Sequence, residues 1–290
     1  MKDFEYFAPK TVEEALSLLS QYREEAKMIA GGQSMLVTMR QGLLAPENLI
    51  DIKGISALDY IHYDEKEGLR IGALTTHRAI EKSPVIQKHY EVLSEMEVNL
   101  ATIQTRNWGT IGGNLCHGDP AGDPAPVLIT LNAKLKVNRV GQERIVPMEE
   151  FSKDFLEVDL GADEMLTEIQ VPIPKPHTGI AYDKLMQMQG DSGIVGTAVS
   201  ITLSPSSGVC EDARIVLGNV SSVPFRARKA ESRLIGKVLN DDLLAEAGQV
   251  ASEEPDPNSD MHATAEYRRE MLKVFVRRTA KRALERAKRG

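Results

Sequence analysis

The first half of the chain contains short apolar segments whose hydrophobic positions follow the pattern of strands. Segments 4–7, 27–30 and 48–52 are compact apolar runs, and 60–74 alternates between apolar and polar residues on both sides of a glycine. The first three segments predict single strands, and 60–74 predicts a hairpin.

Amphipathic stretches between these strands predict helices with recognisable starts. Thr11 and Glu14 have the spacing of a capping box, which predicts a helix to about residue 22. The stretch 76–100 is also predicted to be helical, with Thr76 as a cap and Pro84 near the start of a second helix.

The second half shows strands first and helices afterwards. Residues 133–147 predict a hairpin that turns at Gly141, and 172–179 predicts a linker because Pro172, Pro174 and Pro176 sustain neither a ladder nor a helix. Further strands are expected at 164–174, 180–189, 195–204 and 209–220, followed by helices at about 225–236, 241–252 and 260–288.

Length and composition are typical of a globular protein with two domains. The chain has 290 residues, of which 42% are hydrophobic and 27% charged, enough to form a core and remain in solution. No apolar run approaches the roughly 18 residues of a membrane span, and the first residues lack the apolar stretch of a signal peptide. We therefore expect a cytoplasmic chain.

Charge and cysteine content limit the classes of function. The net charge of −7 disfavours general binding of nucleic acid, although residues 266–290 carry ten Lys and Arg against three Glu. The preferred interpretation of this basic stretch is an amphipathic helix packed on its own domain rather than an arm that binds membrane or nucleic acid. A docking face for an acidic partner subunit remains open. Two cysteines, Cys116 and Cys210, are too few for an iron–sulfur cluster, so any such cluster belongs to a partner.

Two glycine pairs carry the candidate chemistry. Gly31–Gly32 follows a predicted strand and precedes Gln33 and Ser34, and Gly112–Gly113 lies between Thr110 and Asn114. Glycine lacks a Cβ and adopts positive φ, so such loops allow backbone N–H groups to approach a diphosphate. Neither pair fits the Rossmann fingerprint, the P-loop or the nucleophile elbow. An ordinary tight turn remains an alternative explanation of either glycine pair taken alone.

An acidic tract follows the second pair. Cys116, His117, Asp119 and Asp123 suggest a metal site, but the mixed ligand types and the lack of a second cluster disfavour it. Asp119 is expected in a turn. Asp123 is expected to cap a helix, and it can also accept a hydrogen bond from a sugar or ribityl hydroxyl.

Four stretches resemble one protein family. The sequences IAGGQSM (29–35) and IQTRNWGTIGGNLCHGDPAGD (103–123) resemble the two diphosphate loops of the FAD-binding medium subunits of molybdenum hydroxylases. This family includes carbon monoxide, xanthine and nicotinate dehydrogenases. FEYFAPKTVEEALSLL (4–19) is similar to the opening of the family, and ARIVLGNVSSVPFRARKAESRLIGK (213–237) to the signature of its C-terminal domain.

The resemblance implies an α+β fold. It implies a FAD-binding domain of the vanillyl-alcohol oxidase (PCMH) type over 1–174, with subdomains at about 1–55 and 56–174. A C-terminal domain with an antiparallel sheet and helices is implied over 178–290.

The resemblance also implies a set of FAD-binding residues. Asp123 corresponds to a contact with the ribityl or ribose part, Leu166 to a backbone contact beside the isoalloxazine, and Lys184 to a cation near its pyrimidine edge, where positive charge favours the reduced flavin. From residues alone, an exposed lysine on a strand is an equal alternative for Lys184. Leu100 and Ala101 match a position near the adenine, where an aromatic residue would stack better. The full implied set is Ile29, Ala30, Gly31, Gly32, Gln33, Ser34, Met35, Ala101, Thr110, Ile111, Gly112, Gly113, Asn114, Asp123, Leu166 and Lys184.

The implied function is electron transfer by bound FAD, with no catalytic residue acting on substrate in this chain. A small subunit with 2Fe-2S clusters would supply electrons, a large molybdopterin-binding subunit would oxidise substrate, and the complex would be a dimer of heterotrimers. A stand-alone FAD-dependent reductase and a non-enzymatic assembly factor with a degenerate flavin site remain alternatives. The substrate binds in another chain, and NAD, a quinone, ferredoxin and oxygen remain open as acceptors.

Overall fold

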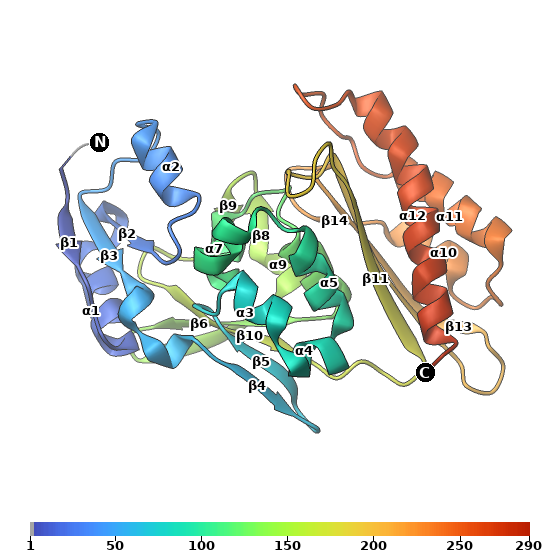
Figure 1. The fold of residues 1–290 in the computed structure, drawn as a ribbon, viewed down its shortest axis with the longest axis horizontal. Coiled ribbons are helices and arrows are strands. Elements are labelled where there is room, and N and C mark those ends of the chain that lie inside the picture. The colour runs from blue at the N-terminus through green and yellow to red at the C-terminus, as the bar shows by residue number, and fades with distance from the viewer. Residues whose placement is uncertain (1–2) are drawn as a thin grey trace.

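The computed structural model describes residues 3–290, which form three larger sheets with their covering helices and one two-stranded sheet. Figure 1 shows these parts side by side, with the N-terminal sheet in blue at one end and the C-terminal sheet in yellow to orange at the other. None of the helices within residues 3–290 is long and apolar enough to cross a bilayer.

The first part of the chain forms a small parallel sheet in the order β1-β3-β2. Its strands are β1 (Glu5–Phe7), β2 (Ala26–Ile29) and β3 (Asn48–Asp51), with helices α1 (Val12–Tyr22) and α2 (Met35–Arg40) between them. Short 3-10 turns lie at Arg23–Glu25, Ile52–Gly54 and Ser56–Leu58.

The predicted capping box opens α1. The Thr11 hydroxyl accepts a hydrogen bond from the N–H of Glu14 at 3.2 Å, and the Glu14 carboxylate accepts one from the N–H of Lys10 at 2.7 Å. Buried Leu16 and Leu19 pack in a core with Ile50 of β3. Helix α1 thus begins where its local sequence predicts and buries one face on the sheet.

The central part is an antiparallel sheet in the order β4-β5-β10-β6-β7, with helices on one side. The two predicted hairpins form its edges, and β10 lies between them, so the sheet is complete only after residue 165. The strands are β4 (Ile61–Asp64), β5 (Gly68–Gly72), β6 (Lys134–Arg139), β7 (Gln142–Pro147) and β10 (Met165–Val171). A separate pair consists of β8 (Ser152–Asp154) and β9 (Glu157–Val158).

The predicted helical stretch 76–100 is divided into three short helices. Thr76 and Ser83 accept hydrogen bonds as N-caps of the first two, and Pro84 opens the second. All helices of the central part are α3 (His77–Lys82), α4 (Pro84–His89), α5 (Glu91–Asn99), α6 (Ile103–Trp108), α7 (Ile111–His117), α8 (Pro124–Thr130) and α9 (Met148–Phe151).

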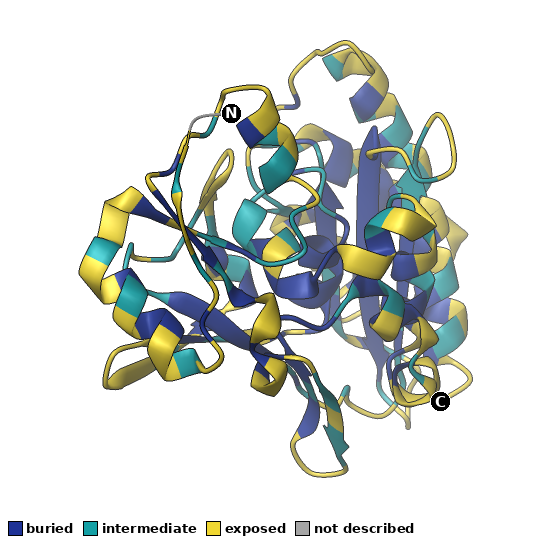
Figure 2. Cartoon of the chain, turned by 60° about the vertical axis from the view of Figure 1, so that its left-hand side comes forward, coloured by how far each residue is buried: buried dark blue, intermediate teal, exposed yellow. Residues whose placement is uncertain are grey.

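The C-terminal part is an antiparallel sheet in the order β11-β12-β13-β14, covered by three helices. The strands are β11 (Thr178–Leu185), β12 (Val195–Leu203), β13 (Cys210–Gly218) and β14 (Phe225–Arg226), and the helices are α10 (Arg228–Leu234), α11 (Asp241–Glu253) and α12 (Ala265–Ala287). All nine residues of β12 are buried; Figure 2 shows buried strands between helices in this part of the molecule.

The basic C-terminal stretch packs on its own domain, as the preferred interpretation predicted. In α12, Leu272, Val276, Ala280 and Ala283 are fully buried in the core of the C-terminal part. The helix approaches β11 so closely that a Cβ on Gly179 would lie 2.0 Å from the carbonyl oxygen of Ala283. Glycine at 179 therefore fixes the distance between α12 and the sheet.

Replacing Gly179 with alanine tests this contact. The added methyl group would collide with the backbone of α12, and we expect the free energy of unfolding to fall by about 3 kcal/mol, as overpacking of a rigid core does. Urea denaturation measures the effect. Gly161→Ala is the control, since the nearest atom to its added Cβ is 3.3 Å away and belongs to a side chain. Equal stabilities of the two variants would contradict the assignment.

Candidate functional site

A cavity of about 800 Å³ is lined by residues from all three parts of the structure. This volume falls in the range of cofactor and ligand pockets, roughly 300–1,000 Å³. Every FAD-binding residue implied by the sequence lines it except Ile111, which is fully buried and donates its N–H to the Thr75 carbonyl at 3.0 Å.

The first glycine pair lies between the end of β2 and the start of α2. A Cβ on Gly31 would be 2.2 Å from the carbonyl oxygen of Trp108, so this segment touches the one that leads into the second pair. Gly32 has φ of +70°, which favours glycine. Within residues 3–290, the backbone N–H groups from Gly31 to Ser34 have no acceptor, so they remain free as hydrogen-bond donors at the cavity.

The second glycine pair is helical, and its expected role as a loop with free N–H donors is wrong. Gly112 and Gly113 lie in α7. The N–H of Gly112 donates to the Ala73 carbonyl at 2.9 Å, and that of Gly113 donates to the Thr110 hydroxyl at 3.1 Å. Both donors are therefore already satisfied within the protein, one by Ala73 outside the helix and one by the cap Thr110.

The surroundings of Gly112 and Gly113 in α7 differ, and a side chain at each would meet different neighbours. A Cβ on Gly112 would lie 2.6 Å from both the Cβ and the carbonyl oxygen of Ala73, so this residue allows the helix to pack. A Cβ on Gly113 would meet its cap Thr110 and, at 3.8 Å, Ala30 across the cavity. Gly113 therefore keeps the space beside the first glycine segment open.

Asp123 joins the central part to the C-terminal sheet. Its carboxylate accepts hydrogen bonds from the Tyr182 hydroxyl and, at 2.8 Å, from the Lys184 ammonium, both on β11. It occupies the N-cap position of α8 but makes no capping hydrogen bond with its side chain. The expected capping role of the Asp123 side chain is therefore wrong.

Lys184 is buried, and the alternative of an exposed strand lysine is wrong. Its side chain is 2% exposed, and its ammonium also donates to the carbonyl of Asn99 at 2.9 Å. Burial raises the pKa of Asp123, while the ion pair with Lys184 opposes that rise. Burial also raises the pKa of Tyr182, which keeps its hydroxyl a donor to Asp123.

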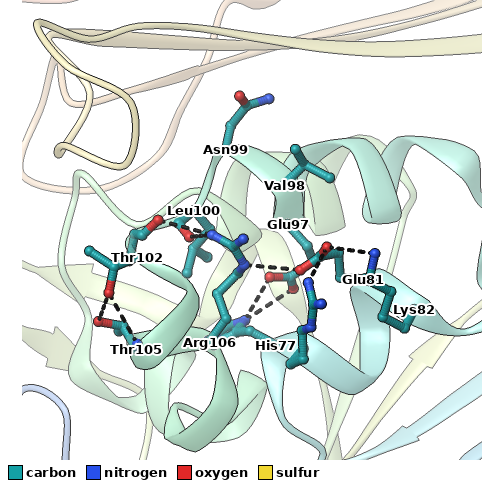
Figure 3. A network of polar contacts seen from close by, with 12 residues as sticks. His77, Glu81, Lys82, Glu97, Val98, Asn99, Leu100, Thr102, Thr105 and Arg106 are labelled. Carbon is teal, nitrogen blue, oxygen red and sulfur yellow. Dashed lines mark hydrogen bonds and ion pairs between the residues drawn. The ribbon is translucent and has the colours of Figure 1, made fainter.

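The turn after α5 forms part of the cavity wall and is held by several donors. Ala101 has φ of +44°, a strained conformation for a residue with a side chain. The Arg106 guanidinium donates to the Leu100 carbonyl at 2.7 Å, as Figure 3 shows. It also donates to the Ala101 carbonyl at 2.9 Å. Gly190 allows the following loop to approach, since a Cβ there would lie 2.7 Å from the Ala101 carbonyl.

A buried charge network behind this turn was not predicted from sequence. Arg106 pairs with Glu81 at 3.0 Å, and His77 Nδ1 lies 3.0 Å from the Glu97 carboxylate (Figure 3). His77 and Glu81 are four residues apart on α3, but Glu97 and Arg106 come from two other helices. Arg106 lies within the quoted stretch 103–123, but the burial and pairing of all four residues become visible only in the fold.

The acidic tract after α7 does not gather ligands for a metal. Within residues 3–290, no group of three or more His, Cys, Asp and Glu side chains is arranged to hold one. Burial raises the pKa of Cys116 to about 12, so its thiol stays protonated near neutral pH. Asp119 forms the expected turn, because its carboxylate accepts the N–H of Ala121 at 2.8 Å.

Comparison with known proteins covers nearly the whole chain. Residues 2–174 match the FAD binding domain in molybdopterin dehydrogenase, and residues 180–283 match the CO dehydrogenase flavoprotein C-terminal domain. The chain belongs to the family of FAD-binding medium subunits of molybdenum hydroxylases. The expected α+β fold, with an FAD-binding domain followed by this C-terminal domain, is thereby confirmed.

Individual relatives of this medium subunit align over nearly their full length. The carbon monoxide dehydrogenase medium chain of Afipia carboxidovorans is 34% identical over 285 residues, 98% of each chain. The glyceraldehyde dehydrogenase medium chain of Sulfolobus acidocaldarius is 31% identical over 279 residues, 96% of this chain and 98% of that one. A structure of carbon monoxide dehydrogenase from Hydrogenophaga pseudoflava superposes with a TM-score of 0.94 at 35% identity, covering 98% of both chains.

The residues of the medium subunit fit its cofactor, FAD. The free N–H groups from Gly31 to Ser34 are suited to a diphosphate, and Gly113 leaves room opposite them. Each oxygen of Asp123 accepts one hydrogen bond and retains capacity for a sugar hydroxyl. The donors, the acceptor and the open volume therefore occur together in one cavity.

A double-mutant cycle on Asp123 and Lys184 tests the buried pair that joins the domains. Asp123→Asn or Lys184→Met alone leaves a buried charge without its partner, and we expect each to cost about 3–5 kcal/mol of unfolding free energy. The double variant should cost clearly less than the sum, as measured by urea denaturation without FAD. The exposed pair Lys281–Asp241, at 3.0 Å, is the control and should couple by less than about 1 kcal/mol. Additive losses at Asp123 and Lys184 would show that the pair is not coupled.

Proposed function

We propose that this chain holds FAD in the 800 Å³ cavity and is the electron-transfer subunit of a molybdenum hydroxylase complex. It would take electrons from 2Fe-2S clusters of a partner subunit and pass them to an external acceptor. The observation that carries the proposal is the meeting of the two glycine segments at one cavity, which the Gly31–Trp108 contact enforces. Bound FAD would supply the redox chemistry, and the chain's own residues would bind and orient it.

The diphosphate is assigned to the space between the two glycine segments. The N–H groups from Gly31 to Ser34 would donate to its oxygens from one side, and Ala30 and Met35 flank them. Thr110 and Asn114 line the opposite side with Gly113. Gly112 would contribute indirectly, since it sets the position of α7 against Ala73.

The remaining contacts are assigned to the other end of the cavity. Asp123 would accept from a ribityl or ribose hydroxyl, Leu166 would lie beside the isoalloxazine, and Ala101 near the adenine. Lys184 uses two of its three N–H bonds on Asp123 and Asn99, so it has one left for the pyrimidine edge. Because Asp123 balances its charge, Lys184 would act on the flavin mainly through that hydrogen bond.

The chain would depend on partners for substrate chemistry. Its relatives are named as medium chains or subunits of complexes, and they match almost end to end, so the chain corresponds to one such subunit. Two cysteines provide too few thiolates for a cluster. We assign the clusters to a small subunit and molybdopterin to a large one, in a cytoplasmic dimer of heterotrimers.

Filling the diphosphate space tests the FAD assignment. We expect Gly113→Val to raise the Kd of FAD by at least about tenfold, because the side chain would occupy the space that faces Ala30. Flavin fluorescence measures the affinity. The control Lys88→Val places the same side chain at an exposed position of α4 that does not line the cavity. Equal FAD affinities in both variants would contradict the assignment.

Isolation of the native complex tests the role as a subunit. We expect the chain to co-purify with two other polypeptides, molybdenum and iron, and the full chain expressed alone to carry flavin without either metal. Metal analysis and the visible absorption spectrum provide the measurement. A lone chain that reduces its own substrate would favour a stand-alone reductase instead.

A further inference from the structure

The imidazole of His77 lies beside the space between the two glycine segments. The side chain is 3% exposed, and His77 lines the cavity. The backbone N–H of His77 donates to the Gly109 carbonyl at 3.0 Å, and the ring Cδ2 lies 3.2 Å from the position of a Cβ on Gly109. The Gln33 Cγ is 3.6 Å from that same position. The Cδ2 edge of the ring, which also carries Nε2, therefore faces the two segments assigned to the diphosphate.

The other ring nitrogen is fixed by a buried carboxylate. His77 Nδ1 lies 3.0 Å from both oxygens of Glu97, which is fully buried at the end of α5 (Figure 3). Within residues 3–290, Nδ1 is the ring nitrogen of His77 that takes part in a hydrogen bond, and Nε2 takes part in none. The Glu97 Oε2 atom is buried without a hydrogen-bond partner of its own. An almost completely buried imidazole thus holds one nitrogen on a carboxylate and has the other free.

The number of protons on the pair decides what Nε2 can bind. With one proton, Nδ1–H donates to the Glu97 carboxylate, Nε2 carries a lone pair, and the pair has a net negative charge. With two protons, one lies between Nδ1 and Glu97, the other makes Nε2–H a donor, and the pair is neutral. Diphosphate oxygens only accept hydrogen bonds, so they select the second state.

We propose that His77, supported by Glu97, is a diphosphate-binding residue, and that FAD binding at the cavity takes up a proton onto this pair. The proposal rests on the proposed function and adds to it a residue and a regulation by pH. It assigns to His77 a contact that complements the backbone donors of the first glycine segment.

Charged groups on several neighbouring elements face the His77–Glu97 pair. Burial raises the pKa of Glu97, which favours the two-proton state, whereas His77 and Arg106 on α6 oppose that rise. Asp123, before α8, raises the pKa of Glu97 further and is itself paired with Lys184 of β11. Glu81 on α3 is neutralised by Arg106 and Arg78, at 3.0 and 2.6 Å. The other charges around the pair are therefore compensated by partners of opposite sign.

The sign of the pH dependence follows from linkage. FAD binds the two-proton state, so it raises the proton affinity of the pair, and protonation raises the affinity for FAD by the same factor. FAD affinity should be constant below the apparent pKa of the pair in the free protein and fall as pH rises above it. In that window, log Kd should rise by up to about one per pH unit, with uptake of up to one proton per FAD.

The experiment measures FAD binding by the full chain, freed of flavin, between roughly pH 6 and 9, a range that covers histidine titration. Flavin fluorescence gives the Kd, and calorimetry in two buffers of different ionisation enthalpy gives the protons taken up. Circular dichroism confirms that each variant is folded.

Two substitutions separate a binding role from a structural one. His77→Asn keeps a donor for Glu97 but removes Nε2, so we expect a Kd about tenfold to a hundredfold higher at the acid end and no pH dependence. Glu97→Gln lets its amide donate to Nδ1, so a neutral imidazole keeps Nε2–H. This variant should bind FAD tightly at both ends of the range. A purely structural role for the pair would weaken binding in both variants at every pH.

His117→Asn is the matched control, because His117 also lines the cavity but lies at the end of α7. It should keep the wild-type slope and proton uptake. The proposal is overturned if wild-type affinity is independent of pH, if His77→Asn keeps the slope, or if His117→Asn loses it. A wild-type chain that binds no FAD at any pH would instead contradict the proposed function itself.

Discussion

The approach of Gly31 to the carbonyl of Trp108 is the contact on which the cavity depends. No side chain fits there, since a Cβ would lie 2.2 Å from that oxygen. Through this contact, a segment of the small parallel sheet and a segment before α7 form adjoining walls, although about eighty residues separate them. The free N–H groups from Gly31 to Ser34 are held at this junction, because the backbone there cannot move away without losing its packing.

Buried charges behind these walls occur as pairs, which determines how the site can respond to pH. An isolated buried charge is costly, but Asp123–Lys184 and Glu81–Arg106 each combine opposite charges with additional hydrogen bonds. Arg106 also donates to the carbonyls around Ala101 and thereby stabilises a strained turn of the wall. His77–Glu97 differs, because the second ring nitrogen of His77, Nε2, takes part in no hydrogen bond within residues 3–290. It is the pair whose proton content a bound anion can change.

The sequence predicts well where local chemistry is sufficient. Local signals determine the structure of their own neighbours in the chain. Helices begin after the caps Thr11 and Thr76, a hairpin turns at Gly141, and the prolines of 172–179 separate two strands, all as predicted. The requirement for glycine at position 112 could not be predicted from its own segment, because the residue that leaves no room for a side chain there is Ala73, from another part of the chain. Aspartate is a common N-cap residue, yet the Asp123 carboxylate accepts its hydrogen bonds from two residues of β11 instead. Glu97 and His77 carry no local signal at all, because burial and partnership arise only when three helices pack together.

The basic C-terminal helix has a role that connects the two domains. Much of its charge is used within the molecule: Arg282 and Arg286 reach Glu95 on α5, and Arg282 also pairs with Asp183 on β11. Helix α5 ends at Asn99, whose carbonyl accepts from Lys184, and the strained turn at Ala101 follows. The same helix that carries Glu97 is thus held from α12 on its outer face and from β11 at its end. Because these contacts act on one rigid element, the C-terminal domain positions the cavity wall that the FAD-binding domain alone would leave less constrained.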